Sequence, residues 1–135
     1  MLMRSYALLI ALVLASGCVQ VLSADYVVAN KNNFINKEIA VSGEAAAGNI
    51  MCTLIACAPE NPCCNACGGS LVLEGGSERI EIRGTYQGKA AGCFGNDCRL
   101  ECYPMQSGSK YSVEGILKES YGELYIELKS FSETK

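Results

Sequence analysis

The segment KYSVEGILKESYGELYIELKSF, residues 110–131, decides the fold class of this 135-residue chain. Apolar and polar residues alternate on each side of Ser120-Tyr121-Gly122, and alternation with a period of two is the pattern of a half-buried strand. A short turn between two such runs predicts an antiparallel hairpin. The residues expected on its buried face are Tyr111, Val113, Gly115, Leu117, Leu124, Ile126 and Leu128.

Earlier segments show the same alternation or a short apolar run. They are residues 38–43, 70–73 and 79–83. The last two are separated by the turn-forming Glu74-Gly75-Gly76-Ser77, which predicts a second hairpin. No long amphipathic helix is indicated, and only a helical turn is expected at Lys89-Ala90-Ala91. One strand, a hairpin, an irregular connection and a closing hairpin is the element order of the five-stranded OB barrel.

The amino-acid sequence of the closing hairpin resembles that of a known class of proteins. Tyr111-Ser-Val-Glu-Gly115 and Leu124-Tyr-Ile-Glu-Leu128 resemble the last two strands of small bacterial OB-fold proteins, and the resemblance covers about residues 37–131. It implies an all-β domain, a small five- to six-stranded OB-like barrel with two disulfide-rich loops. A small β-sandwich is the alternative.

The first residues have the order of a secretory signal peptide, with one arginine, an apolar core and then small residues. The stretch Leu14-Ala15-Ser16-Gly17-Cys18 resembles the bacterial lipobox. That resemblance implies cleavage of residues 1–17 and a diacylglyceryl thioether plus an N-acyl chain on Cys18, and more than one acyl chain gives stable anchoring. The alternatives are an uncleaved signal anchor of about 20 residues and ordinary cleavage after Ala24.

The rest of the chain divides into an N-terminal segment and one domain. Residues 18–36 are predicted to be the lipid-anchored N-terminus and a polar tether, because asparagines and lysines alternate there, with a short strand near 26–28 as an option. Residues 37–135 form the cysteine-rich barrel domain. In enteric-type bacteria, Val19 after the lipidated cysteine implies that the protein is sorted to the outer membrane, where it would face the periplasm or the cell surface. The alternative is a soluble periplasmic or secreted protein.

The cysteines are the strongest chemical feature. The chain has nine, and lipidation of Cys18 would leave an even number for disulfides in an oxidising compartment. The disulfide candidates are Cys52, Cys57, Cys63, Cys64, Cys67, Cys93, Cys98 and Cys102. Because adjacent cysteines bonded to each other form a strained ring, Cys63 and Cys64 should have different partners. The alternatives are a Cys-only zinc or copper(I) site and a thiol-redox centre at Cys64-Asn65-Ala66-Cys67.

Composition excludes several classes of function. The chain has no histidine, which removes Ser-His-Asp, Cys-His and HExxH chemistry. Its net charge is −3, with scattered basic residues, so it is a poor electrostatic match for nucleic acid. No nucleophile–base pair or carboxylate dyad stands out. We therefore expect no enzymatic activity, no cofactor, no metal and no nucleic-acid partner.

A candidate ligand face lies on the predicted middle strands and closing hairpin. Its residues are Arg79, Arg83, Tyr86, Tyr121 and Tyr125. OB folds bind ligands on the face of strands 2 and 3 and on adjoining loops, so these residues could form a groove for an anionic or sugar-like ligand. The alternative is a solvated face, since Glu81 lies between the two arginines.

The predicted function is therefore an exported, membrane-anchored lipoprotein whose disulfide-stabilised β-domain has a non-enzymatic binding or structural role in the cell envelope. Its partner would be an envelope protein or a small ligand. The lipid anchor would hold the protein on the membrane. The alternative is an exported metal-binding or thiol-redox protein that uses the Cys63-Cys64-x-x-Cys67 cluster.

Overall fold

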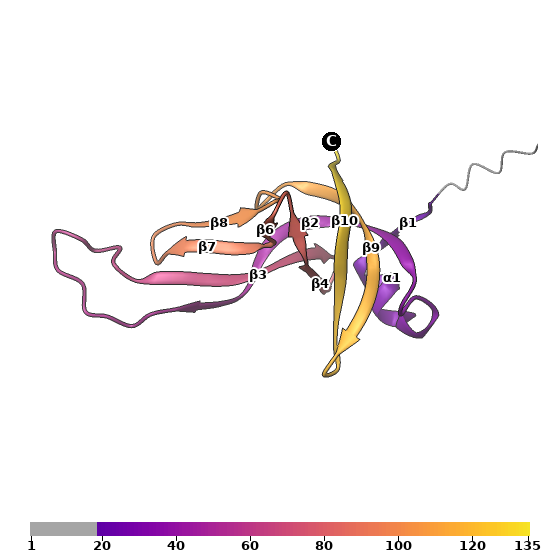
Figure 1. The fold of residues 1–135 in the computed structure, drawn as a ribbon, viewed down its shortest axis with the longest axis horizontal. Helices are drawn as coiled ribbons and strands as arrows, with labels where there is room; N and C mark the ends of the chain where they lie inside the picture. Colours follow the sequence, from indigo (N-terminus) through magenta and orange to yellow (C-terminus); the bar gives the residue numbers. More distant parts are fainter. Residues whose placement is uncertain (1–18) are drawn as a thin grey trace, which may run out of the picture.

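The computed structural model describes residues 19–135, and most of them are in strands (Figure 1). The prediction of a small all-β domain is confirmed. The predicted signal peptide and Cys18 lie outside the described residues. In chain order the elements are β1 (Val21–Ser23), α1 (Ala24–Ala29), the 3-10 helix η1 (Lys31–Asn33), β2 (Glu38–Cys52), β3 (Ala66–Gly75), β4 (Glu78–Arg83), β5 (Thr85–Tyr86), β6 (Lys89–Ala90), β7 (Gly92–Asn96), β8 (Leu100–Tyr103), β9 (Lys110–Ser120) and β10 (Glu123–Glu133).

Five strands pair in a ring. β2 pairs antiparallel with both β3 and β9, β3 pairs antiparallel with β4, and β9 pairs antiparallel with β10. A parallel pairing of β4 with β10 completes the order β2–β3–β4–β10–β9–β2. The predicted closing hairpin is β9–β10. Its turn residues Tyr121 and Gly122 have φ values of 51° and 78°, and two positive φ angles match the right-handed twist of paired strands.

Alternate side chains of the ring strands form one buried cluster, as the alternating pattern predicts. Those exposed by 5% or less are Ile39, Val41, Ala45, Leu71, Leu73, Ile80, Ile82, Tyr111, Val113, Leu117 and Ile126. Leu124 and Leu128 are only partly buried, and the β9–β10 register shifts just after Leu128. Met105 is fully buried in the same cluster although it lies in the connection before β9, so strand alternation gives no indication of it.

Residues 21–36 pack on the ring, which corrects the expected tether for this segment and the optional strand at 26–28. β1 pairs parallel with β2, and α1 begins after Ser23, whose Oγ accepts a hydrogen bond from the Tyr26 N–H at 3.2 Å. Ala24 and Val27, one helical turn apart, are fully buried. Asp25 Oδ1 accepts from the Glu78 N–H at 2.9 Å, tying the helix to the β3–β4 turn. The short apolar face and the cap outweigh the polar composition around them.

The connection between β4 and β9 also differs from the expectation. The helical turn expected at residues 89–91 is wrong, because β5 and β6 form a two-residue hairpin there. Its turn residues Gln87 and Gly88 have φ values of 51° and 80°, so the chain reverses as a tight hairpin and not as a helix.

The cysteine-rich segments form a sheet that extends away from the ring. β2 and β3 continue beyond the ring, and β7 and β8 add to the free side of β3, giving the order β2–β3–β7–β8. We call residues 46–69 and 92–103 the arm. Figure 1 shows the arm projecting to one side, with the curved β9–β10 hairpin and α1 at the other side. The second expected loop is thus largely strand, and irregular chain is concentrated in residues 53–65.

Candidate functional site

All eight cysteines from Cys52 onward are paired in four disulfides. The pairs are Cys52–Cys67, Cys57–Cys64, Cys63–Cys98 and Cys93–Cys102. Cys63 and Cys64 have different partners, as predicted. The cysteines of the CxxC motif, Cys64 and Cys67, are bonded to other residues, so the dithiol pair that a thioredoxin-like centre requires is not formed.

Two of the disulfides join residues that are directly opposite each other in the arm. Cys52 faces Cys67 across β2 and β3, and Cys93 faces Cys102 across β7 and β8, with Cα–Cα distances of 4.1 and 3.9 Å. The other two fasten the irregular segment 53–65, one within itself and one to Cys98 in the β7–β8 turn. Strand pairs and the connecting segment are therefore all held covalently.

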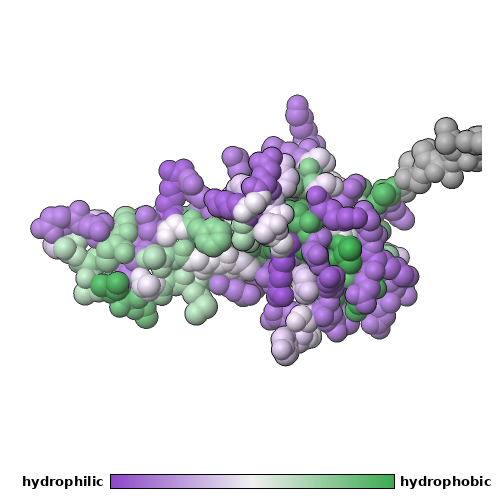
Figure 2. Space-filling view, viewed as in Figure 1, coloured by the Kyte–Doolittle hydropathy of each residue, from purple (hydrophilic) through white to green (hydrophobic). Residues whose placement is uncertain are grey.

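The arm needs these bonds because it is a single layer of sheet. Cross-strand neighbours share a face, so Met51, Gly68 and Phe94 line one side. Met51 is 79% and Phe94 49% exposed, and within the described residues no second layer covers them. Figure 2 shows apolar residues gathered over the arm while hydrophilic residues dominate the ring. Without a two-layer core, disulfides supply much of the stability by restricting the unfolded chain, about 2 to 4 kcal/mol each.

Asn65 organises the irregular segment through its side-chain amide. Its Oδ1 accepts from the Ile55 N–H at 2.7 Å and from Thr53 Oγ1 at 3.1 Å. Its Nδ2 donates to the Ile55 carbonyl at 3.2 Å and to Asp97 Oδ2 at 3.0 Å. One side chain thus connects both sides of the segment to the β7–β8 turn.

The same corner contains the one cluster of potential metal ligands in the described part of the chain. It consists of Cys63, Asp97 and Cys98, whose ligand atoms lie within 4.8 Å of one another. The sulfurs of Cys63 and Cys98 are bonded to each other, and a metal requires deprotonated thiolates. In this oxidised state only the Asp97 carboxylate can act as an anionic ligand. The geometry therefore favours a covalent staple over a metal centre.

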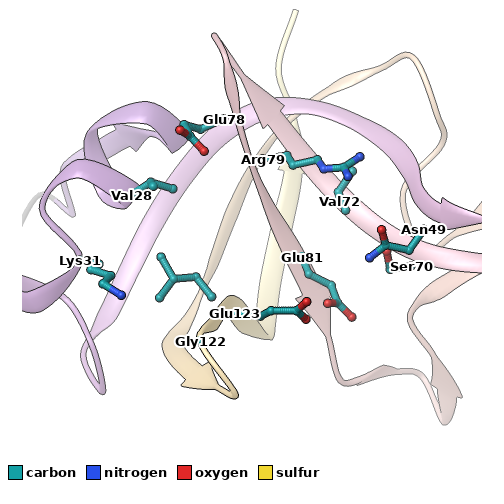
Figure 3. A pocket seen from close by; sticks show the side chains of 11 residues that line it. Val28, Lys31, Asn49, Ser70, Val72, Glu78, Arg79, Glu81, Gly122 and Glu123 are labelled. Atoms are coloured by element: carbon teal, nitrogen blue, oxygen red, sulfur yellow. The ribbon is translucent and has the colours of Figure 1, made fainter.

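A groove of about 410 Å³ lies on the outward side of β3 and β4 (Figure 3). Its apolar floor includes Val72, which is 4% exposed although it points away from the main core, and α1 contributes Val28. Polar side chains surround this floor. They are Lys31, Asn49, Ser70, Glu78, Arg79, Glu81 and Glu123.

Most charges around the groove are already paired. Lys31 Nζ contacts Glu119 at 2.6 Å, and Glu81 accepts from Arg83. Among the described residues, no ion pair involves Arg79, whose side chain reaches toward Val72 and Asn49 in Figure 3. Arg79 is therefore the groove cation that is free to meet an incoming anionic group.

The structure keeps part of the predicted ligand face together. Arg79 and Arg83 lie on the outward face of β4, and Tyr125 of β10 is paired with Glu81 between them. Arg79 lines the groove, and Arg83 contacts Glu81 and Glu123, which also line it. Arg83 donates to Glu81 at 2.9 and 3.0 Å, and its guanidinium lies 4.2 Å from the Tyr125 ring centre. The hydrogen bond to Glu81 raises the pKa of Arg83 above its ordinary value. Tyr86 packs edge-on against Phe131. Tyr121 is fully exposed at the β9–β10 turn, so the five residues do not form one surface.

Sequence reasoning missed the groove residues from other elements. Lys31 lies in the segment whose composition predicts a polar tether, and Asn49 lies where the β2–β3 register shifts, with a φ of 48°. A residue with positive φ other than glycine is most often Asn or Asp, but nothing in the alternation pattern places this bulge. Val72 is the one groove residue that the sequence could have indicated, because it makes the run Leu71-Val72-Leu73 apolar on both faces of the strand.

Comparison of the chain with protein-family models, curated proteins and solved structures finds no match. Within residues 19–135, the helices are too short or too polar to cross a bilayer.

Proposed function

We propose that this protein is an exported, lipid-anchored binding module of the bacterial envelope, without enzymatic activity. The observation that carries the proposal is the pairing of eight cysteines into four disulfides in an arm that has no core of its own. Disulfides form and persist in oxidising, extracytoplasmic compartments, and this arm depends on them. The lipobox-like Leu14-Ala15-Ser16-Gly17 before Cys18 supports anchoring through that residue.

The proposed module has an OB-like architecture. Its support is the pairing order of the ring, in which the third strand lies parallel to the last, together with a long excursion between the third and fourth strands. In OB folds the second and third strands carry the ligand surface. The corresponding strands here, β3 and β4, carry the groove around Arg79.

Replacing the lipidated residue tests the envelope assignment. In a bacterium that processes lipoproteins, Cys18→Ala should abolish incorporation of labelled fatty acid and move the protein from the membrane to the soluble fraction. The expected loss is nearly complete, because removing all acyl chains removes the anchor. The wild-type protein and Cys18→Ala should both keep four disulfides, measured as a mass about 8 Da below that of the fully reduced chain.

Ser16→Thr, a change two residues before the cysteine that leaves the Cys18 thiol in place, is the matched control and should leave the protein on the membrane. Unchanged membrane retention of Cys18→Ala would instead favour an uncleaved signal anchor. Free thiols together with one equivalent of bound metal would contradict the disulfide-stabilised module itself.

We further propose that the groove takes a small anionic ligand with an apolar part, held by Arg79 over the floor formed by Val72. The oxidised protein should retain such a species from an envelope extract, detected by mass spectrometry after denaturation. Arg79→Ala should lose at least about tenfold of it, since a hydrogen bond to a charged group contributes about 1.5 to 3 kcal/mol.

Arg99→Ala removes an arginine from the arm, where Arg99 pairs with Glu101 at 2.7 Å, and should retain the ligand at the wild-type level. Equal loss in both variants would mean that only general positive charge matters. No retained anion in the wild-type protein would contradict the groove as a ligand site.

A further inference from the structure

β1 joins the start of the described chain to the ring. Its three residues pair with residues 40–42 of β2, and Ala24, which follows directly, is fully buried. Ala24 packs closely on Gly75 of β3, where an added Cβ would lie 3.2 Å from the Ala24 Cβ. Ordinary cleavage after Ala24 would remove β1 and this packed residue from the domain. The fold therefore favours processing before Val21.

The connection between Cys18 and the ring is very short. Only Val19 and Gln20 separate Cys18 from β1. A fully extended chain gains no more than about 3.6 Å per residue, so Val21 can lie at most about 11 Å from Cys18. Acyl chains on Cys18 would hold that residue at the surface of the bilayer. Residues 19–24, which we call the β1 end of the ring, would then lie beside the lipid headgroups.

The β1 end is chemically suited to the boundary between lipid and water. Residues 19–24 include no charged side chain, and the side chains of Val19 and Val21 are each about half exposed. Figure 2 shows apolar surface where the described chain begins. Apolar side chains gain from leaving water whatever the lipid charge, so this contact does not require anionic lipids.

β2 determines the direction of the arm relative to the β1 end. This strand pairs with β1 through residues 40–42 and continues into the arm as far as Cys52. At about 3.3 Å per residue, the part beyond Ser42 extends the strand by up to about 33 Å. Figure 1 shows the arm at one side of the ring and β1 and α1 at the other. The tip of the arm is therefore remote from the β1 end.

The exposed apolar side chains of the arm lie on both of its faces. Met51 and Phe94 share one face. Ile50 and Leu100 lie on the other face, where they line a pocket of about 270 Å³ beside Cys52. A flat bilayer could cover only one face of a single-layer sheet. An arm lying along the membrane would thus leave the other apolar face in water.

We propose that the β1 end of the ring contacts the bilayer surface and that the arm is presented away from it. This arrangement depends on the lipidation of Cys18 proposed above. It gives the domain a defined orientation, because the folded chain begins next to the anchor and not after a long tether. The part of the protein that reaches furthest from the membrane is then the covalently supported arm.

Single tryptophans can measure this orientation, because the chain has none of its own. The lipidated full-length variants Val21→Trp and Leu54→Trp are reconstituted in phosphatidylcholine vesicles that contain lipid spin-labelled at the headgroup. Val21→Trp should lose at least about half of its emission, because it lies within about 11 Å of the anchored residue. Leu54→Trp, about 30 Å or more further along, should lose less than about a tenth.

A spacer variant tests whether the short connection causes this contact. A flexible insertion of about 12 Gly and Ser residues between Val19 and Gln20 adds a root-mean-square reach of about 19 Å, so quenching of Val21→Trp should fall at least about twofold. The spacer variant should remain in the membrane fraction, because Cys18 and the residues before it are unchanged. Hydrogen exchange of β9 and β10 checks that each variant is folded.

The possible results separate the orientation from the lipidation on which it depends. Equal quenching of Leu54→Trp and Val21→Trp would show that the arm lies on the bilayer, and would overturn the proposed orientation. Strong quenching of Val21→Trp that survives the insertion would overturn the short connection as its cause. Absence of the wild-type protein from the membrane fraction would instead contradict the lipidation of Cys18 itself.

Discussion

Reduction of the disulfides is expected to unfold the arm while the ring of five strands stays folded. The ring has its own buried cluster, whereas the arm exposes Met51, Leu54 and Phe94 to solvent. Burial of each ring side chain contributes about 1.5 to 3 kcal/mol before chain entropy is subtracted. The arm has no comparable contribution, so loss of its covalent closure leaves the conformational entropy of its residues uncompensated.

Hydrogen exchange with and without a reducing agent measures this difference. Amides of residues 46–69 and 92–103 should lose protection on reduction, while those of β9 and β10 should remain protected. Cys93 is the exception to follow, because it is fully buried in the main cluster as well as bonded to Cys102. If β9 and β10 lost protection together with the arm, the disulfides would be holding the ring itself.

Removing a single disulfide should destabilise the arm more when that disulfide closes a longer loop. Cys63–Cys98 spans 35 residues and Cys57–Cys64 spans 7, and the entropy removed from the unfolded chain grows with loop length. Replacing Cys63 and Cys98 by serine should therefore destabilise the arm more than the same change at Cys57 and Cys64. Equal effects would point to local packing and not to chain entropy as the main contribution.

Truncation of a ring side chain should have the second large effect. Leu117 is fully buried between the strands, so Leu117→Ala should lower the free energy of unfolding by about 2 to 5 kcal/mol through lost burial and a residual cavity. Urea unfolding followed by circular dichroism measures the change. Leu54→Ala is the matched control, because Leu54 is 98% exposed in the arm and its truncation should change stability by about 0.5 kcal/mol or less.

A small effect of Leu117→Ala would contradict the view that the ring is the main source of stability. A large effect of Leu54→Ala would show that this leucine is covered in solution, for example by a bound partner or a second molecule. Either result would change the division between a self-sufficient ring and a covalently supported arm.

Sequence periodicity predicted the ring because its strands are half buried. Ile80 and Ile82 alternate with charged residues in β4, and the buried residues of β9 and β10 alternate with more exposed ones. The arm strands were not predicted because they lack this regular half-burial. Burial in the arm strands is confined to a few positions such as Cys67 and Cys93, and glycines occupy positions 68, 69 and 95, so no run of alternating core and solvent residues exists there for a pattern to record.

The helix α1 and the groove were beyond the reach of local patterns. Six residues are too few to show helical periodicity, although Ser23 and Asp25 are favourable for a helix start. The groove combines β2, β3, β4, the β9–β10 turn and the N-terminal segment, which only the folded chain brings together. The cysteine pairing is likewise a tertiary property, since eight cysteines allow 105 pairings and their spacing does not select one.

The crossed pairing of the cysteines has a topological consequence for peptide-bond cleavage. Exposed loop tips are the preferred sites of proteolytic nicking, and residues 58–62 and 97–99 form such tips. Wherever one peptide bond is cut between Cys52 and Cys102, at least one disulfide joins a residue before the cut to one after it. A protease that nicks this region once therefore leaves a single covalent molecule, and no fragment is released until a second bond or a disulfide is broken.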